Sequence, residues 1–270
     1  MTASSSHPSH SPSREPRLIS AATNPLLKDL RRLAQEPGAY RKLGRIWLEG
    51  DHLARALLAR GGQPRLAVIS RDAWQLQPHL RELAMAAEEV VLIEPALLGG
   101  ISSLESHAPI GFLIDAPSQG ALQPGVATVV FDRLQDAGNV GTVLRSAAAL
   151  GVVQGVALKG CAALWSPKVL RAGMGAHFAL HLVEGVSPDQ LDALRVPLVA
   201  TSSYAETELH RLSLPRPCAW VFGHEGQGVD AALMQRCALT VRIPQPGGEE
   251  SLNVAAAAAI CLYESVRQGG

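Results

Sequence analysis

Apolar positions recur along this chain in short runs, and their spacing alternates between that of strands and that of helices. The first helix is expected over residues 24–36, where four leucines recur at helical spacing within a basic segment. Asn24 and Pro25 are residue types that begin helices, as the cap and as the first helical residue. The other elements expected in this first block are strands at 46–48, 66–69, 90–93 and 111–114, and helices at 51–60 (capped by Asp51) and 78–89. Strands alternating with helices predict a small α/β domain over residues 18–115.

A second block of the same kind follows residues 116–125, whose Pro, Gly, Ser and Gln content is typical of a linker. The same alternation predicts a larger α/β domain with a parallel sheet over residues 126–270. Its strands are expected at 126–131, 154–158, 197–201, 218–222 and 239–243, and its helices at 140–150, 167–176, 229–235 and 252–267.

The composition fits two folded domains behind a disordered leader. Of the 270 residues, 47% are apolar, which is enough to fill two cores. Residues 1–17 are rich in Ser, His and Pro and have neither core-forming residues nor the apolar stretch of a secretory signal. The four cysteines stand singly, which argues against a disulfide framework and a structural zinc site and fits a reducing cytoplasm. No apolar run approaches the roughly 18 residues of a membrane span. We therefore expect a soluble cytoplasmic protein.

Charge is distributed unevenly, although the formal net charge is zero. Residues 1–71 carry twelve Lys or Arg against five Asp or Glu, whereas residues 72–130 carry one against seven. A basic N-terminal third is what a phosphate-binding face requires. An ordinary solvated helix surface would give the same charge, so this observation alone does not decide the partner.

Three loops after predicted strands have the glycine and polar content expected of ligand sites, because ligands of doubly wound sheets collect beyond the strand ends. The first, residues 132–141, contains Asn139 and is expected to turn tightly at Gly138 and Gly141. Arg145 lies one turn into the helix that follows this loop. The second, residues 223–228, has three glycines. The third, residues 243–253, precedes an Ala-rich helix that allows another backbone to pack closely against it.

Each loop by itself also has an ordinary structural explanation. The first is compatible with a plain strand-to-helix turn, and it lacks the GxGxxG dinucleotide fingerprint. In the second, His224 beside Glu225 suggests a metal, but HExxH is absent because Gly228 occupies the second His position. In the third, Ser251 can simply cap the helix, where Asn253 would be a poor helix residue. No metal site is expected.

Together, the three loops resemble the three successive motifs of the SpoU (TrmH-type) RNA ribose methyltransferases. The matching segments are NVGTVLRSAAALG from Asn139, VFGHEGQG from Val221 and IPQPGGEESLNVAAAAA from Ile243. SPKVLRAGMGA from Ser166 also fits the family pattern. ISAATNPLLKDLRRL and YRKLGRIWLEG in the N-terminal block resemble the ribosomal-protein-like domain that binds the RNA substrate in such enzymes. The resemblance covers nearly everything from residue 18 onward.

This resemblance implies a fold, a cofactor and a reaction. The family's C-terminal domain is a parallel α/β sheet with a deep trefoil knot, and the family works as homodimers whose active sites mix residues of both chains. S-adenosyl-L-methionine is held by backbone groups of the second and third motifs, and its methyl group goes to a ribose 2′-hydroxyl. The positions that match cofactor contacts are Gly223, Ile243 and Leu252, with Thr201 as a weaker match. Those that match catalysis and substrate contact are Asn139, Arg145, Glu225, Ser251 and Asn253.

Arg145 matches the position for which a general-base role has been proposed in the family. A guanidinium is effectively always protonated, so we expect Arg145 to fix the RNA phosphate and stabilise the incipient alkoxide instead. That phosphate or a water would then take the proton.

Four positions depart from the usual family pattern. Ala137 follows Asp136 where Pro is common, His224 stands where Asn is usual, Gly173 replaces a frequent Ser, and Gln245 sits where Met often follows the Ile-Pro pair. All the positions matched to catalysis are present, so the enzyme interpretation is kept.

The expected substrate is ribosomal RNA rather than tRNA, because the two-domain layout resembles ribosomal RNA methylases. A tRNA ribose methyltransferase and a non-catalytic RNA-binding member of the fold remain alternatives. Base methylation by a related knotted enzyme is a further one, although the Ser-Leu-Asn motif and the Asn139/Arg145 pair look more like ribose methylation. A nucleotide-binding oxidoreductase is disfavoured, because the dinucleotide fingerprint and its acidic ribose partner are missing.

Overall fold

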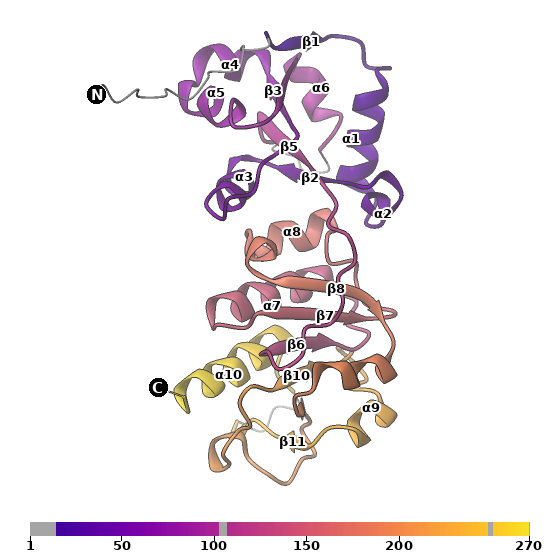
Figure 1. Cartoon of the computed structure of the whole chain (residues 1–270), viewed down its shortest axis with the longest axis vertical. Coiled ribbons are helices and arrows are strands. Elements are labelled where there is room, and N and C mark those ends of the chain that lie inside the picture. The colour runs from indigo at the N-terminus through magenta and orange to yellow at the C-terminus, as the bar shows by residue number, and fades with distance from the viewer. Residues whose placement is uncertain (1–14, 103–106, 248–250, 270) are drawn as a thin grey trace, which may run out of the picture.

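The computed structural model describes residues 15–102, 107–247 and 251–269. Two α/β domains, each built on its own sheet, are stacked along the long axis of the molecule (Figure 1). The predicted fold class is thus confirmed, with a smaller α/β domain ahead of a parallel-sheet α/β domain. The first fourteen residues of the predicted leader lie outside the described residues, and its last residue, Arg17, begins a strand.

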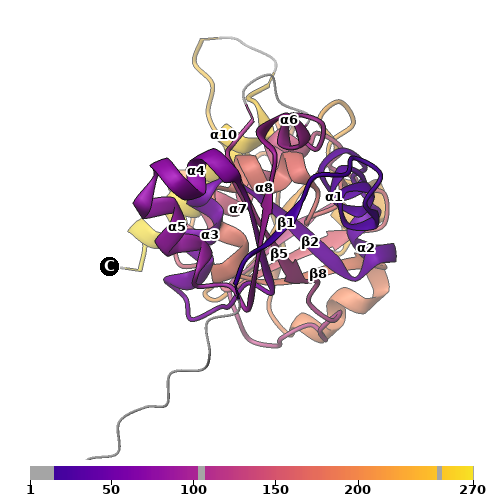
Figure 2. The same cartoon turned by 90° about the horizontal axis from the view of Figure 1, so that it is seen from above.

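The N-terminal sheet has five strands in the order β1-β4-β3-β5-β2. Strand β5 runs antiparallel to its neighbours β3 and β2, whereas the β1, β4 and β3 pairs are parallel. Seen from above, α3, α4 and α5 lie on one side of this sheet and α1 and α2 on the other (Figure 2). The elements are β1 (Arg17–Ile19), α1 (Pro25–Gln35), α2 (Ala39–Leu43), β2 (Arg45–Glu49), α3 (Asp51–Leu58), β3 (Leu66–Ser70), α4 (Arg71–Leu76), α5 (Pro78–Ala84), β4 (Glu89–Ile93), α6 (Pro95–Gly99) and β5 (Ile110–Asp115).

The C-terminal sheet has six strands in the order β11-β9-β10-β6-β7-β8, and every pair is parallel. Because all strands run the same way, their carboxyl ends share one edge of the sheet. The elements are β6 (Thr128–Phe131), α7 (Ala137–Ala149), β7 (Gln154–Leu158), α8 (Pro167–Gly173), β8 (His181–Val186), β9 (Leu198–Thr201), β10 (Ala219–Phe222), α9 (Ala231–Gln235), β11 (Leu239–Val241) and α10 (Val254–Arg267), with 3-10 turns η1 (Ala176–Ala179), η2 (Pro188–Leu194) and η3 (Leu209–Arg211).

Helix α1 shows how the local sequence specifies an element. The Oδ1 of Asn24 accepts the backbone N–H of Leu26 at 2.9 Å, and Pro25 takes the first helical position, as predicted. Leu27, Leu30 and other apolar residues at helical spacing are fully buried against the sheet. A side-chain cap of this kind stabilises a helix by about 1 kcal/mol.

Two predicted caps are wrong. Gly50, not Asp51, caps α3, and Asp51 instead forms an i,i+4 ion pair with Arg55 at 3.1 Å. Asn253, not Ser251, caps α10: its Oδ1 accepts the N–H groups of Ala255 and Ala256 at 2.9 and 3.3 Å. Asn253 is therefore not a poor helix residue, because it lies just before the helix.

Other elements were missed or misplaced by the hydrophobic pattern. Strands β1 and β8 and helices α2, α4 and α6 were not predicted, because three- to six-residue segments with mixed polarity give little periodic signal.

Helix α7 begins at Ala137 rather than residue 140, so Gly138 and Gly141 lie within the helix and make no turn. Gly141 is needed because α8 approaches so closely: a Cβ there would lie 2.6 Å from the carbonyl oxygen of Val169.

The departure from the family pattern at Gly173 has a similar structural reason. A Cβ at this position would lie 2.6 Å from Cε1 of His177. His177 is buried, and its Nε2 is 2.8 Å from the carbonyl oxygen of Leu164. Burial lowers the pKa of His177 to about 4, so the imidazole is neutral near pH 7. Gly173 thus makes room for a neutral, buried histidine.

The two domains are joined by a polar contact on β8. The hydroxyl of Tyr40 in α2 donates to Oε2 of Glu184 at 2.5 Å, and Arg41 pairs with Oε1 at 2.8 Å. The N–H of Leu164 donates to the same Oε1 at 2.8 Å. A single cluster of buried apolar residues includes both Phe112 of the first sheet and Phe131 of the second. The domains therefore pack as one body.

Candidate active site

A cavity of about 560 Å³ opens at the carboxyl edge of the C-terminal sheet. Its walls come from the segments that follow β9, β10 and β11 and from the start of α10. Four lining positions, Thr201, Gly223, Ile243 and Leu252, are those predicted to contact the cofactor, and the predicted Glu225, Ser251 and Asn253 line it too. The second and third loops picked out from the sequence thus form one hollow.

The motif-two loop, residues 223–228, is closed on itself. The N–H of His224 donates to the carbonyl oxygen of Gly228 at 3.0 Å, and the N–H of Gly228 donates back at 2.8 Å. A Cβ at Gly223 would lie 2.2 Å from backbone atoms of residues 228 and 229, so only glycine allows this closure. The Nδ1 of His224 accepts the N–H of Gly226 at 3.0 Å, so the histidine at this departure position stabilises the loop from within.

A chain of hydrogen bonds joins the three motifs. The Nδ2 of Asn253 donates to Oδ1 of Asn139 at 3.1 Å, and the Nδ2 of Asn139 donates to Oε1 of Glu225 at 3.4 Å. The amide orientations are mutually fixed, because Oδ1 of Asn253 is already used to cap α10. Three of the predicted catalytic residues are therefore brought together, although they are up to 114 positions apart in sequence.

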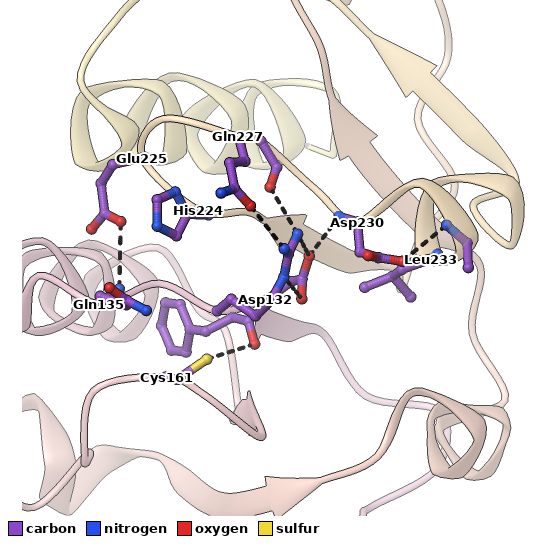
Figure 3. Close-up of polar contacts among 12 residues, drawn as sticks. Asp132, Gln135, Cys161, His224, Glu225, Gln227, Asp230 and Leu233 are labelled. Atoms are coloured by element: carbon purple, nitrogen blue, oxygen red, sulfur yellow. Dashed lines mark hydrogen bonds and ion pairs between the residues drawn. The ribbon is translucent and has the colours of Figure 1, made fainter.

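Glu225 is held at the start of α7. It accepts the N–H of Asp136 at 2.9 Å and that of Gln135 at 3.4 Å, the latter contact being visible in Figure 3. Partial burial raises the pKa of Glu225, but the hydrogen bonds from Asp136, Asn139 and Gln135 outweigh it, so the pKa lies below its usual value. Glu225 is therefore an ionised acceptor near neutral pH and a weak base.

Sequence analysis missed the part played by Asp136. Its carboxylate caps α7 by accepting the N–H of Asn139 at 2.8 Å, and Lys168 of α8 pairs with it at 3.3 Å. These two contacts lower the pKa of Asp136, with the Asn139 hydrogen bond as the larger cause. An aspartate three residues before Asn139 is a recognisable cap signal, so this role could have been found from the sequence.

Arg145 stands apart from this assembly. It is exposed on α7 and does not line the cavity, and its side chain makes no hydrogen bond or ion pair within the described residues. Ser251 lines the cavity and is exposed, without the helix cap expected of it. Asn139 does not line the cavity either, but unlike Arg145 it hydrogen-bonds to two residues that do, Asn253 and Glu225.

Neither a cluster of metal-binding side chains nor a membrane-spanning helix lies within the described ranges. Among these residues, no group of three or more His, Cys, Asp or Glu side chains could hold a metal ion. None of the helices in the same ranges is long and apolar enough to cross a membrane.

Comparison with solved structures identifies the class of protein. The chain superposes on the crystal structure of the SpoU methyltransferase AviRb from Streptomyces viridochromogenes in complex with the cofactor AdoMet. The TM-score is 0.83 at 26% identity, over 91% of this chain and 98% of that one. The fold is thus that of the knotted α/β methyltransferases, as predicted.

Sequence comparison then gives the family. The profile of the SpoU rRNA Methylase family matches residues 127–263. A 23S rRNA (uridine(2479)-2′-O)-methyltransferase of Streptomyces viridochromogenes is 37% identical over 79% of each chain. The 23S rRNA (guanosine(2553)-2′-O)-methyltransferase RlmP of Bacillus subtilis is 29% identical over 91% of this chain and 97% of its own. The chain belongs to the SpoU rRNA Methylase family, and the predicted resemblance is confirmed.

Proposed function

We propose that this protein transfers the methyl group of S-adenosyl-L-methionine to a ribose 2′-hydroxyl of ribosomal RNA, as a cytoplasmic homodimer. In this proposal residues 18–115 bind the RNA, 116–125 form the linker and 126–270 form the methyltransferase domain. The main support for the proposal is that the Asn253–Asn139–Glu225 hydrogen bonds connect all three family motifs, and that Asn253 and Glu225 line one cavity.

The cavity suits the cofactor in size and chemistry. Its volume of about 560 Å³ lies within the roughly 300–1,000 Å³ of small-molecule sites. Ile243, Leu252 and Ala257 offer apolar contact, while the glycine-rich motif-two loop offers backbone groups at close range. When bound, S-adenosyl-L-methionine supplies a methyl group on a positively charged sulfur, so the protein needs mainly to align the acceptor and exclude water.

The geometry narrows the choice of proton acceptor. A ribose 2′-hydroxyl becomes nucleophilic as its proton is removed or its developing charge is stabilised. Glu225 is a poor candidate for a base, because its oxygens are already occupied by Asp136, Gln135 and Asn139. Arg145 is always protonated but free to bind, which suits it to anchor an RNA phosphate and stabilise the alkoxide. The phosphate or a water then takes the proton.

The position of Arg145 supports a homodimer. If Arg145 acts in the reaction but lies outside its own cavity, a second protomer offers the cavity that it serves. Helix α10, which packs on α7, also exposes the apolar side chains of Ile260, Tyr263 and Val266, at 41%, 60% and 42%. Docking this face against a second copy would bury apolar surface that is otherwise left in water.

Two measurements test the proposal. Isothermal titration of the purified protein with S-adenosyl-L-methionine is expected to show binding, and absence of binding would leave a non-catalytic RNA-binding member of the fold. Mass mapping of RNA from a strain lacking the protein is expected to reveal one missing 2′-O-methyl group in ribosomal RNA. If every ribosomal ribose methylation persisted and a tRNA site were lost instead, the ribosomal substrate would be wrong.

A further inference from the structure

Arg133 has a backbone conformation that residues with a side chain avoid. It directly follows Asp132 at the end of β6, and its φ is 55°, in the left-handed region. Met174 and Arg195 share this conformation, but both lie at the C-terminal caps of helical turns, where it is common. Arg133 lies in a loop that leads from a strand to a helix. A strained residue of this kind persists when surrounding contacts hold it, and those contacts point to what it does.

The guanidinium of Arg133 connects β6 to the motif-two loop. Its Nε and Nη2 donate to the two carboxylate oxygens of Asp132 at 3.2 and 3.3 Å. Its Nη1 donates to Oε1 of Gln227 at 3.1 Å, and Nη2 also lies 3.5 Å from the carbonyl oxygen of Gly228. The planar guanidinium thus binds the carboxylate of Asp132 with one part of its donor set and the motif-two loop with the other.

Asp132 is the fixed end of this connection. Its side chain is 5% exposed, and it also accepts the N–H of Asp230 at 2.6 Å. Asp230 in turn caps α9 by accepting the N–H of Ala232 at 2.9 Å. Figure 3 shows Asp132 lying between Gln227 and Asp230, with the motif-two loop passing above it. The loop and the helix that follows it are therefore both anchored on one buried carboxylate.

We propose that Arg133 is a positioning residue that holds the motif-two loop in the shape that binds the cofactor. Both loop residues that it contacts, Gln227 and Gly228, line the cavity, whereas Arg133 itself does not. With three glycines in six residues, this loop has many conformations to lose on binding. A loop held in place beforehand loses fewer, which favours binding of the cofactor. The inference rests on the proposed function, because it takes S-adenosyl-L-methionine as the ligand.

Replacement by glycine separates this role from an ordinary structural one. Arg133→Gly removes the guanidinium but suits the backbone, since glycine adopts a φ of 55° without strain. Arg195→Gly is a matched control: Arg195 has a φ of 52°, is exposed and does not line the cavity. Both variants are expected to fold.

The measurement is titration of each purified protein with S-adenosyl-L-methionine. Arg133→Gly is expected to raise Kd about tenfold, with Arg195→Gly at the wild-type value. In steady-state methylation, Arg133→Gly should raise the KM for the cofactor and leave kcat at saturating cofactor within about twofold, because Arg133 does not touch the cavity. Wild-type Kd and KM in Arg133→Gly would overturn the positioning role and leave the proposed function intact. No binding by the wild-type protein would instead overturn the proposed function.

A double-mutant cycle tests whether Arg133 acts through the loop. Gln227→Ala removes the side-chain acceptor on the loop, so it should weaken cofactor binding in the same direction as Arg133→Ala. Because both changes break the Arg133–Gln227 hydrogen bond, the double variant should lose less binding free energy than the sum of the two single losses. Fully additive losses would show that Arg133 does not act through Gln227, which contradicts the inference.

Discussion

Two parts of the candidate site lie on one helix, α7, and are built in opposite ways. At its first turn, Asn139 is fixed on both sides by Asn253 and Glu225. Less than two turns further on, Arg145 is exposed, and its side chain has no hydrogen-bond or ion-pair partner in the part of the chain that the structure describes. The first group is held within one chain, and the second is free to bind something outside it.

The first sequence motif contains both residues, but the difference in their contacts indicates two separate roles. Groups fixed in advance need no reorganisation when the reaction begins, which is how preorganised polar groups accelerate it. A free guanidinium has no such constraint and is suited to meet a phosphate that arrives with the RNA. Within the proposed function, Asn139 therefore belongs to the framework of the site and Arg145 to the capture of substrate.

The largest effect should come from Arg145. Arg145→Ala is expected to lower kcat/KM for methyl transfer by about 100- to 1,000-fold, the usual cost of losing one group that stabilises developing charge. The Kd for S-adenosyl-L-methionine should stay unchanged, because Arg145 does not line the cavity of its own chain and is proposed to bind the RNA phosphate rather than the cofactor. Transfer of radiolabelled methyl to RNA, together with calorimetry, measures both quantities.

Arg145→Lys provides the matched control for charge alone. Lysine keeps the charge but lacks the planar fork, so we expect it to restore a small part of the activity. Nearly full activity across neutral pH with weaker RNA binding would contradict a bidentate role.

Asn139 should have a smaller effect on activity and a larger one on the framework. Asn139→Ala leaves Asn253 without its acceptor and Glu225 without a donor, so a loss of about 10- to 100-fold in kcat is expected. Thr142→Ala is the control on the same helix, since the Thr142 hydroxyl donates to the carbonyl oxygen of Gly138. Equal losses in the two variants would mean that the Asn253–Asn139–Glu225 connection has no special part in catalysis.

Two variants of Asn253 separate its role as the cap of α10 from its hydrogen bond to Asn139. Asn253→Ala is expected to lower the free energy of unfolding by about 1 kcal/mol, because α10 loses its cap. Asn253→Ser keeps a capping oxygen but loses the amide donor, so it should recover the stability and not the activity. Chemical denaturation and methylation assays on both variants test this, and recovery of both properties by serine would assign Asn253 to capping alone.

The smallest effect concerns pH. Because its pKa in the folded protein is depressed, Glu225 contributes stability that is present above its ordinary value of 4.5 and is lost as pH falls through the lowered folded value. Glu225 therefore stays ionised between about pH 5 and 9. Glu225→Gln is expected to lower the rate a few-fold at every pH in that range without moving the pH–rate profile. A shifted acid limb would show that Glu225 exchanges protons during the reaction.

The sequence predicts the fold and the cavity residues better than it predicts how they are held. Strand ends followed by glycines placed Gly223 and Ile243 at one edge of the sheet, because parallel strands share that edge. The hydrogen bonds that connect Asn253 to Asn139 could not be predicted, since they depend on the packing of α10 against α7. The place of Gly141 within α7 could not be predicted either, because a glycine required by a close approach between helices looks the same in the sequence as a glycine required by a turn.

The contact of Tyr40 and Arg41 with Glu184 has a consequence for how the RNA is addressed. The side chain of Glu184 is only 11% exposed and also accepts the N–H of Leu164, so the N-terminal domain is bound to a carboxylate on β8 that is itself held in place. Within the proposed function, a rigid body of this kind sets a constant span between the surface that grips the RNA and the cavity that modifies it. The methylated nucleotide would then be selected by its distance from the RNA segment that the N-terminal domain binds, rather than by the identity of its base.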